Sequence, residues 1–236
     1  MPEFQQHAFE KFCGCDSDEL AAGSPSKPAI WLFGIEHGTY KSVHDNREGV
    51  IEEGDKSYSI DIQMKWSYNQ KAFKLLAAIY SYPVKKFREF AHKYQPFVKG
   101  SSGFFKGNIY PYPCHNEKSW PEKAKRITGF QSKVDYQKWC REFRLPVIRS
   151  WIEEYQPKAM ICVGLGFAED FAIATFGKKV EFKEYKFSVN DKNKRILYIK
   201  AENKTLVVLP HLSSPSGLNS NKSLEIAGKF VAKLIG

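Results

Sequence analysis

Two polar segments, each directly after a short apolar run, carry the side chains best suited to chemistry. The first is GIEHG at residues 34–38, where Glu36 supplies a carboxylate that can act as a base or stabilise positive charge. The second is HLSSPSGLN at residues 211–219, where His211 and several serines can donate hydrogen bonds to an anion. In open α/β sheets, ligands bind in the crevice at the carboxyl ends of the strands. We therefore expect the two segments to form one site.

The apolar runs before these segments predict the strands that hold them. Each run is short and continuous, as is usual for parallel strands covered on both faces. Four such strands are expected at residues 29–35, 107–113, 159–164 and 206–211, with helices at 69–80, 85–94, 130–155, 166–176 and 222–235. Prolines should shorten the second strand, and Pro146 should divide the helical region 130–155 in two. Residues 114–129 are expected to form a basic loop, and alternation over 180–200 predicts a β-hairpin.

These elements predict the α/β class. The expected architecture is a three-layer α/β/α sandwich with a central mostly parallel four-stranded sheet plus an appended β-hairpin. No shift in composition marks a linker, so residues 1–236 are expected to form a single domain, with 1–28 as an N-terminal arm. No apolar run approaches the roughly 20 residues of a membrane span, and no secretory signal is visible. We expect a cytoplasmic monomer with no membrane partner.

The composition indicates a polyanionic partner. The formal net charge is +10, and 15% of the residues are aromatic, many of them interleaved with lysine and arginine. Such interleaving suits base stacking beside phosphate contacts, as in proteins that bind nucleic acids. It also suits a solvated basic surface over a core covered by amphipathic side chains. Charge alone leaves both explanations open.

Four motifs occur in the order seen in the uracil-DNA glycosylase superfamily, which the chain resembles over most of residues 29–235. They are GIEHG after the first strand, Asn108 at the second, VGLGFAEDF at the third and SPSGLN at the last. SPSGLN is similar to the asparagine-proline-serine-glycine loop of the mismatch-specific uracil glycosylases. The resemblance implies a DNA glycosylase of base excision repair, which hydrolyses the N-glycosidic bond of uracil or a related damaged base in DNA.

The resemblance also implies roles for individual residues. Glu36 would stabilise positive charge on the sugar or orient a water, and Asn108 would read the polar edge of the base. His211 would donate a hydrogen bond to the departing base, although an alternative alignment gives that position to Ser214. The proposed DNA- or phosphate-binding positions are Gly34, His37, Gly38, Ser214, Ser216 and Gly217. The aromatic residue that stacks on the extruded base is left open among Tyr40, Trp66, Tyr68 and Tyr110.

The resemblance requires no cofactor, but the cysteines offer an alternative. One branch of the superfamily holds an iron–sulfur cluster on four cysteines, and the order of Cys13, Cys15, Cys114 and Cys140 is similar. The spacing departs from that branch, since the first two are separated by one residue and the last two by 26 positions. A 4Fe–4S cluster therefore stands as the alternative to free, packed thiols.

Each assignment has a structural competitor. Glu36 could be an ordinary loop carboxylate, His211 a histidine that merely ends a strand, and Asn108 a strand residue bonded to the backbone. The whole chain could likewise be a non-catalytic relative that binds a nucleic acid or a nucleotide, or an iron–sulfur protein. The geometry around the strand ends is what separates these interpretations.

Overall fold

The computed structural model describes residues 23–26, 29–38, 58–114, 118–212 and 216–236. The expected N-terminal arm over residues 1–28 therefore lies outside the described residues, except for the short piece 23–26. That piece runs antiparallel along the outer strand of the sheet, where Gly23 bridges Phe105 and the Ser24 N–H donates to the Phe104 carbonyl at 3.2 Å.

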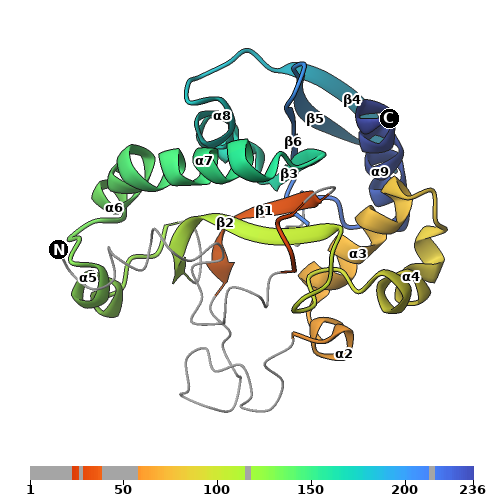
Figure 1. The fold of residues 1–236 in the computed structure, drawn as a ribbon, viewed down its shortest axis with the longest axis horizontal. Coiled ribbons are helices and arrows are strands. Elements are labelled where there is room, and N and C mark those ends of the chain that lie inside the picture. Colours follow the sequence, from red (N-terminus) through yellow and green to blue (C-terminus); the bar gives the residue numbers. More distant parts are fainter. Residues whose placement is uncertain (1–22, 27–28, 39–57, 115–117, 213–215) are drawn as a thin grey trace.

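The chain forms one six-stranded, mostly parallel mixed sheet. Its strands are β1 (Ile30–Gly38), β2 (Phe104–Cys114), β3 (Ala159–Val163), β4 (Lys183–Val189), β5 (Lys192–Lys200) and β6 (Thr205–Leu209). They lie in the order β2-β1-β3-β6-β5-β4 (Figure 1). The first four in this order are mutually parallel, whereas β5 is antiparallel to both β6 and β4. The α/β class is confirmed.

The expected four-stranded sheet with an appended hairpin is corrected by this topology. The hairpin β4–β5 continues the sheet, because β5 pairs with β6 from Leu197 opposite Val208 to Lys200 opposite Thr205. The physical reason is that this half of β5 is not purely solvent-facing. Leu197 and Ile199 pack on one core and Tyr198 on the other, so the strand fits a sheet covered on both faces.

The second strand is longer than expected. Residues 107–113 were predicted to form a strand cut short by prolines, whereas β2 runs over 11 residues with Pro111 and Pro113 inside it. Strand β2 lies at the edge of the sheet. An edge strand tolerates proline because its outward-facing positions need no N–H donor for a neighbouring strand.

Helices cover both faces of the sheet (Figure 1). On one face lie α2 (Ile60–Gln63), α3 (Ser67–Ile79), η2 (Val84–Lys86), α4 (Phe87–Tyr94) and α9 (Asn221–Ile235). On the other lie α5 (Glu122–Thr128), α6 (Lys133–Trp139), the π-helical segment η3 (Cys140–Arg144), α7 (Leu145–Tyr155), η4 (Leu165–Phe167) and α8 (Ala168–Phe176). Each layer encloses its own apolar core against the sheet, as expected for a domain built of packed layers.

Two details of the second layer differ from the sequence-based expectation. Residues 114–129, expected to be a basic loop, contain the helix α5. Pro146 does not separate two helices; it lies in the first turn of α7, where its missing N–H is tolerated, and η3 joins α6 to α7 without a gap. None of the helices in the described ranges has the length and apolar character needed to cross a bilayer.

Candidate functional site

The strand order points to the carboxyl ends of the central strands as the place where a ligand would bind. The chain passes from β1 outward to β2 and then returns to β3 on the other side of β1. Such a reversal opens a crevice beyond the carboxyl ends of the strands where the order changes, here β1 and β3. Gly34 and Glu36 lie toward this end of β1, and His211 follows β6.

Gly34 and Asn108 lie side by side at this edge. They are paired in register between β1 and β2. A Cβ atom on Gly34 would lie only 2.4 Å from Oδ1 of Asn108 and 3.9 Å from the hydroxyl oxygen of Tyr68. The amide of Asn108 thus occupies the space that any side chain at position 34 would need. Glycine is required here by close approach, and the glycine-rich turn and the asparagine belong to one arrangement.

Tyr68 connects this arrangement to the last strand. Its ring lies near the ring of His211, with centroids 6.0 Å apart and an interplanar angle of 51°. His211 is held by the backbone, since its carbonyl accepts a 3.0 Å hydrogen bond from the Leu218 N–H, which closes the loop after β6. Leu212 and Leu218 anchor both ends of that loop in the core. Gly34, Asn108, Tyr68 and His211 therefore converge from four separate segments.

Lys106, which has no role in the sequence motifs, lies beside these residues. The ammonium of Lys106 donates to the Tyr58 hydroxyl and to Oδ1 of Asn69, both at 3.0 Å. It also lies 5.4 Å from the ring centroid of Tyr58 and 5.3 Å from that of Tyr68. Side chains two residues apart on a strand point to the same face, so the spacing of Lys106 and Asn108 was the signal that could have found it. The cluster thus holds a fixed positive charge.

Burial raises the pKa of Tyr68 to about 12, although the nearby Lys106 ammonium opposes the shift. The folded state therefore holds the phenol proton more tightly than the unfolded state, whose tyrosine pKa is about 10. The contribution of Tyr68 to stability should be complete below pH 10 and should be lost as the pH rises from about 10 to about 12. We expect the free energy of unfolding, measured with urea across this range, to fall more steeply for the wild type than for Tyr68→Phe. Parallel curves would contradict the placement of Tyr68.

Glu36 forms a second polar group at the same edge. Its Oε1 accepts a 2.9 Å hydrogen bond from the ammonium of Lys133, at the start of α6, and the two side chains are only 7% and 8% exposed. The thiol of Cys114 interacts with both groups, and burial together with the Glu36 carboxylate raises its pKa to about 11. Glu36 is thus a buried, charge-compensated carboxylate beside a protonated thiol.

Arg144 fixes the backbone that carries Asn108. The fully buried guanidinium donates from Nη2 to the Asn108 carbonyl and from Nε to the Ile109 carbonyl, both at 3.2 Å. It lies 5.5 Å from the ring centroid of Trp151 on α7. Arg144 ends η3, and π-helical segments often occur where a side chain must be aimed at a functional element.

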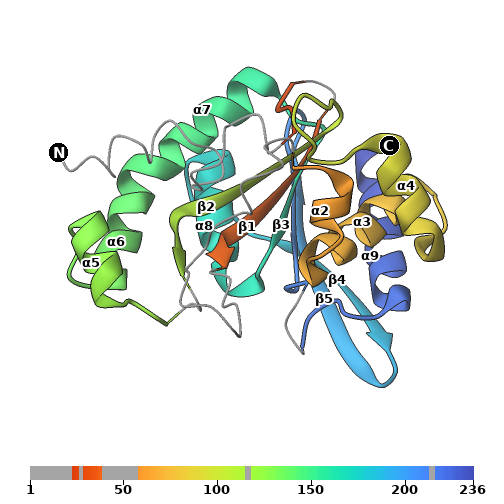
Figure 2. The same ribbon diagram turned by 90° about the horizontal axis from the view of Figure 1, so that it is seen from below.

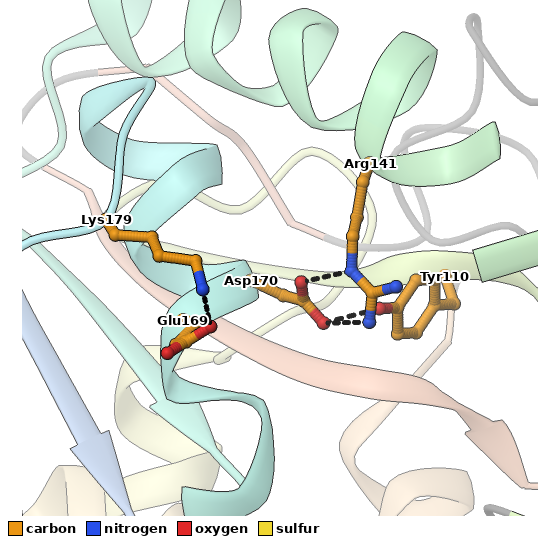
Figure 3. Close-up of polar contacts among 5 residues, drawn as sticks. All are labelled: Tyr110, Arg141, Glu169, Asp170 and Lys179. Carbon is orange, nitrogen blue, oxygen red and sulfur yellow. Dashed lines mark hydrogen bonds and ion pairs between the residues drawn. The ribbon is translucent and has the colours of Figure 1, made fainter. Parts of the chain in front are cut away.

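Figure 3 shows a third polar group, around Asp170 in the first turn of α8. Its carboxylate accepts from Nε and Nη2 of Arg141 at 2.6 and 3.0 Å and from the Tyr110 hydroxyl at 2.6 Å. The group borders a pocket of about 350 Å³ that is also lined by Glu169 and Lys179. Positive and negative charges balance around this pocket, and both Asp170 oxygens are already engaged. The group therefore ties η3 and α8 to β2.

We expect Asp170→Asn to lower the free energy of unfolding by about 2 kcal/mol, because one amide N–H₂ would oppose either the Arg141 or the buried Tyr110 donor. Urea unfolding followed by circular dichroism measures the change. Glu169→Gln is the matched control, since its ion pair with Lys179 is exposed (Figure 3) and should contribute less than about 1 kcal/mol. Equal losses in both variants would show that the Asp170 group stabilises the fold no more than an exposed ion pair does.

The structure brings together some of the predicted site residues and separates others. Gly34, Asn108 and His211 lie around Tyr68. Of the other aromatic candidates, Trp66 stacks on Tyr58, Tyr110 is buried against Asp170, and Tyr40 lies outside the described residues. Glu36 instead pairs with Lys133. Of the remaining predicted positions, His37 and Gly38 are in β1. Ser216 is exposed and Gly217 is buried, whereas Ser214 lies outside the described residues.

Only two of the four cysteines in the iron–sulfur alternative lie among the described residues. Cys114 and Cys140 are buried free thiols, while Cys13 and Cys15 lie outside the described residues. Among the residues that are described, no three or more histidine, cysteine, aspartate or glutamate side chains are grouped to hold a metal ion. The cluster of four cysteines stays a prediction that iron analysis of anaerobically purified protein would decide.

A scan against protein-family models and a search of curated proteins both find no match for this chain. The contacts of its own residues therefore carry the functional proposal.

Proposed function

We propose that the protein is a DNA glycosylase that hydrolyses the N-glycosidic bond of uracil or a related damaged base. The observation that supports this is the convergence of Asn108, Tyr68 and His211 around Gly34 at the carboxyl edge of the sheet. An amide, an aromatic ring and an imidazole are the groups needed to bind an extruded pyrimidine by its polar edge, its face and its carbonyl. The net charge of +10 favours a polyanionic substrate.

In this reaction the bond between the sugar and the base breaks, and the base leaves as an anion. A water molecule bonds through its oxygen to the anomeric carbon of the sugar and releases a proton, which neutralises the departed base. Tyr68 provides a wall on which the base stacks, and the amide of Asn108 donates to and accepts from its polar edge. His211 donates a hydrogen bond to the carbonyl on which negative charge develops. The Lys106 ammonium, held between Tyr58 and Asn69, adds a positive potential behind the base. Glu36 serves the sugar side, with Lys133 setting its position.

The test is base excision from uracil-containing oligonucleotides, offered as single strands, as U:A pairs and as U:G pairs. Alkali after the reaction converts each abasic site into a strand break, which a gel resolves. We expect cleavage of at least one of the three substrates and none of the matched thymine control. Intact strands for all three, at protein in excess over DNA, would overturn the proposal.

A second candidate is a relative of the same fold that binds a nucleic acid or a nucleotide without excising a base. The ion pair between Glu36 and Lys133 favours it, because a carboxylate neutralised by a buried lysine is a weaker stabiliser of positive charge on a sugar. This candidate predicts that the protein binds the same oligonucleotides, measured by fluorescence anisotropy, and releases no base from them. Release of free uracil would exclude it.

A further inference from the structure

The hairpin β4–β5 extends past the end of the sheet beside the candidate site. Pairing between β5 and β6 begins at Leu197, so residues 192–196 of β5 lie beyond the last paired residue of β6. Because β5 is antiparallel to β6, this overhang projects past the carboxyl end of β6, which His211 follows. Figure 2 shows the hairpin β4–β5 extending beyond the other strands. We call the hairpin segment from Lys186 to Arg195 the arm.

The arm is basic and touches the loop after β6. It contains four basic side chains, Lys186, Lys192, Lys194 and Arg195, and one acidic side chain, Asp191. The ammonium of Lys194 donates to the Ser216 carbonyl at 2.5 Å, so the arm lies directly against the loop that begins at His211. Lys186 and Arg195 share one carboxylate, Glu184, which leaves an excess of positive charge on that face as well.

A tight turn at the tip and a ring stack at the base support the arm. Its two turn residues, Asn190 and Asp191, both have positive φ (49° and 57°), which matches the tight two-residue turn preferred by hairpins. At its base, the ring of Tyr185 stacks on that of Phe230 of α9, with centroids 4.1 Å apart and an angle of 6°. Because these contacts order the hairpin before binding, less conformational entropy is lost when its basic side chains bind a ligand.

We propose that the arm binds the phosphate backbone of a DNA strand whose base enters the candidate site. This inference rests on the proposed function and adds a surface to it. Basic side chains on a preorganised ribbon contact phosphates without reading sequence, and they fix the register of the strand. Lysines on an exposed edge strand such as β4 can also serve only to prevent aggregation, so the experiment must separate the two roles.

The arm variant is Lys186→Gln, Lys192→Gln and Arg195→Gln combined, which leaves Lys194 and its contact with Ser216 intact. The matched control is Lys85→Gln, Arg88→Gln and Lys93→Gln. It removes the same charge from exposed positions on η2 and α4, and α4 lies away from the hairpin β4–β5 (Figure 2). Affinity for single-stranded and duplex oligonucleotides is measured by anisotropy as a function of salt. Circular dichroism and thermal unfolding confirm that both variants are folded.

We expect the arm variant to bind more weakly and to have a shallower salt dependence. The slope of log association constant against log salt should fall in magnitude by about 0.9 for each phosphate that the variant no longer neutralises, hence by roughly 2 to 3 for three residues. The control should change the slope by less than the amount expected for one phosphate. Replacing the same three arm positions with the alternative cation, Lys186→Arg, Lys192→Arg and Arg195→Lys, should restore the slope.

The possible outcomes distinguish the proposed role of the arm from the proposed function. Equal changes in the arm and control variants would assign the effect to net charge. If the arm variant aggregates but keeps the wild-type salt slope, the basic residues of the arm serve to protect the edge strand β4 from aggregation. If the wild type excises uracil and the arm variant keeps the wild-type salt slope, the proposed role of the arm is wrong and the proposed function stands. If the arm variant loses slope but the wild type excises no base, phosphate binding by the arm stands and the proposed function is wrong.

Discussion

Replacing Lys133 with methionine is expected to lower the free energy of unfolding by about 3–5 kcal/mol, the usual cost of removing one partner of a buried ion pair. Glu36 and Lys133 are 2.9 Å apart and 7% and 8% exposed, so the carboxylate that remains has little water to solvate it. It must either stay charged without its compensating ammonium or take up a proton, and both choices are unfavourable near neutral pH. Urea unfolding followed by circular dichroism gives the difference.

Two further variants make this result specific. Lys125→Met is the matched control, because Lys125 also pairs with a glutamate, Glu122, but on an exposed surface, where about 1 kcal/mol or less is expected. The double variant Glu36→Gln with Lys133→Met removes both charges and should lose less than the sum of the single variants. A Lys133→Met loss no larger than that of Lys125→Met would show that the pair is not shielded from water.

His211→Ala should lower kcat for uracil excision about 10²- to 10³-fold, the range found when one donor to a developing anion is removed. The imidazole lies beside Tyr68, near the place where Asn108 pairs with Gly34, so its loss removes the donor and leaves Tyr68 and Asn108 in place. Single-turnover excision with protein in excess measures the chemical step without a contribution from product release. KM should change much less than kcat.

His92→Ala is the matched control for His211→Ala. His92 lies on α4 and is exposed, with Asp61 at 3.8 Å, so its removal should leave excision unchanged. Full activity in His211→Ala would show that the loop after β6 supplies its donor from another position. Ser214, the alternative from the sequence motif, would then be the next residue to replace.

Local sequence patterns determined much of the fold. The continuous apolar runs 29–35 and 159–164 correspond to strands β1 and β3, since a strand buried on both faces must be apolar throughout. The alternating residues of 180–200 correspond to the hairpin. Helix α8 ends at Phe176, the end expected for the helix 166–176, and Gly177, with φ of 75°, caps it. These features depend on neighbours in the chain, which the sequence displays directly.

The candidate site could be predicted only in part. The motifs pointed to Gly34, Asn108 and His211, and Tyr68 was one of four candidate aromatic residues. The structure places Tyr68 beside His211 and adds Lys106. The sequence could not choose Tyr68 from the other aromatic residues, and the only local signal for Lys106 is its two-residue spacing from Asn108 on a strand. Their importance comes from contacts made across the fold.

The tertiary structure alone decided which distant residues meet. Glu36 and Lys133 are 97 positions apart, and no local pattern indicates that the start of α6 covers the end of β1. The position of β2 at the edge of the sheet, which allows it to contain two prolines, also depends on the whole fold. So does the pairing of β5 with β6, which joins the hairpin to the sheet and leaves the arm extending beyond it. Strand order and helix packing are set by the whole core at once, whereas a sequence pattern reports only the few residues around it.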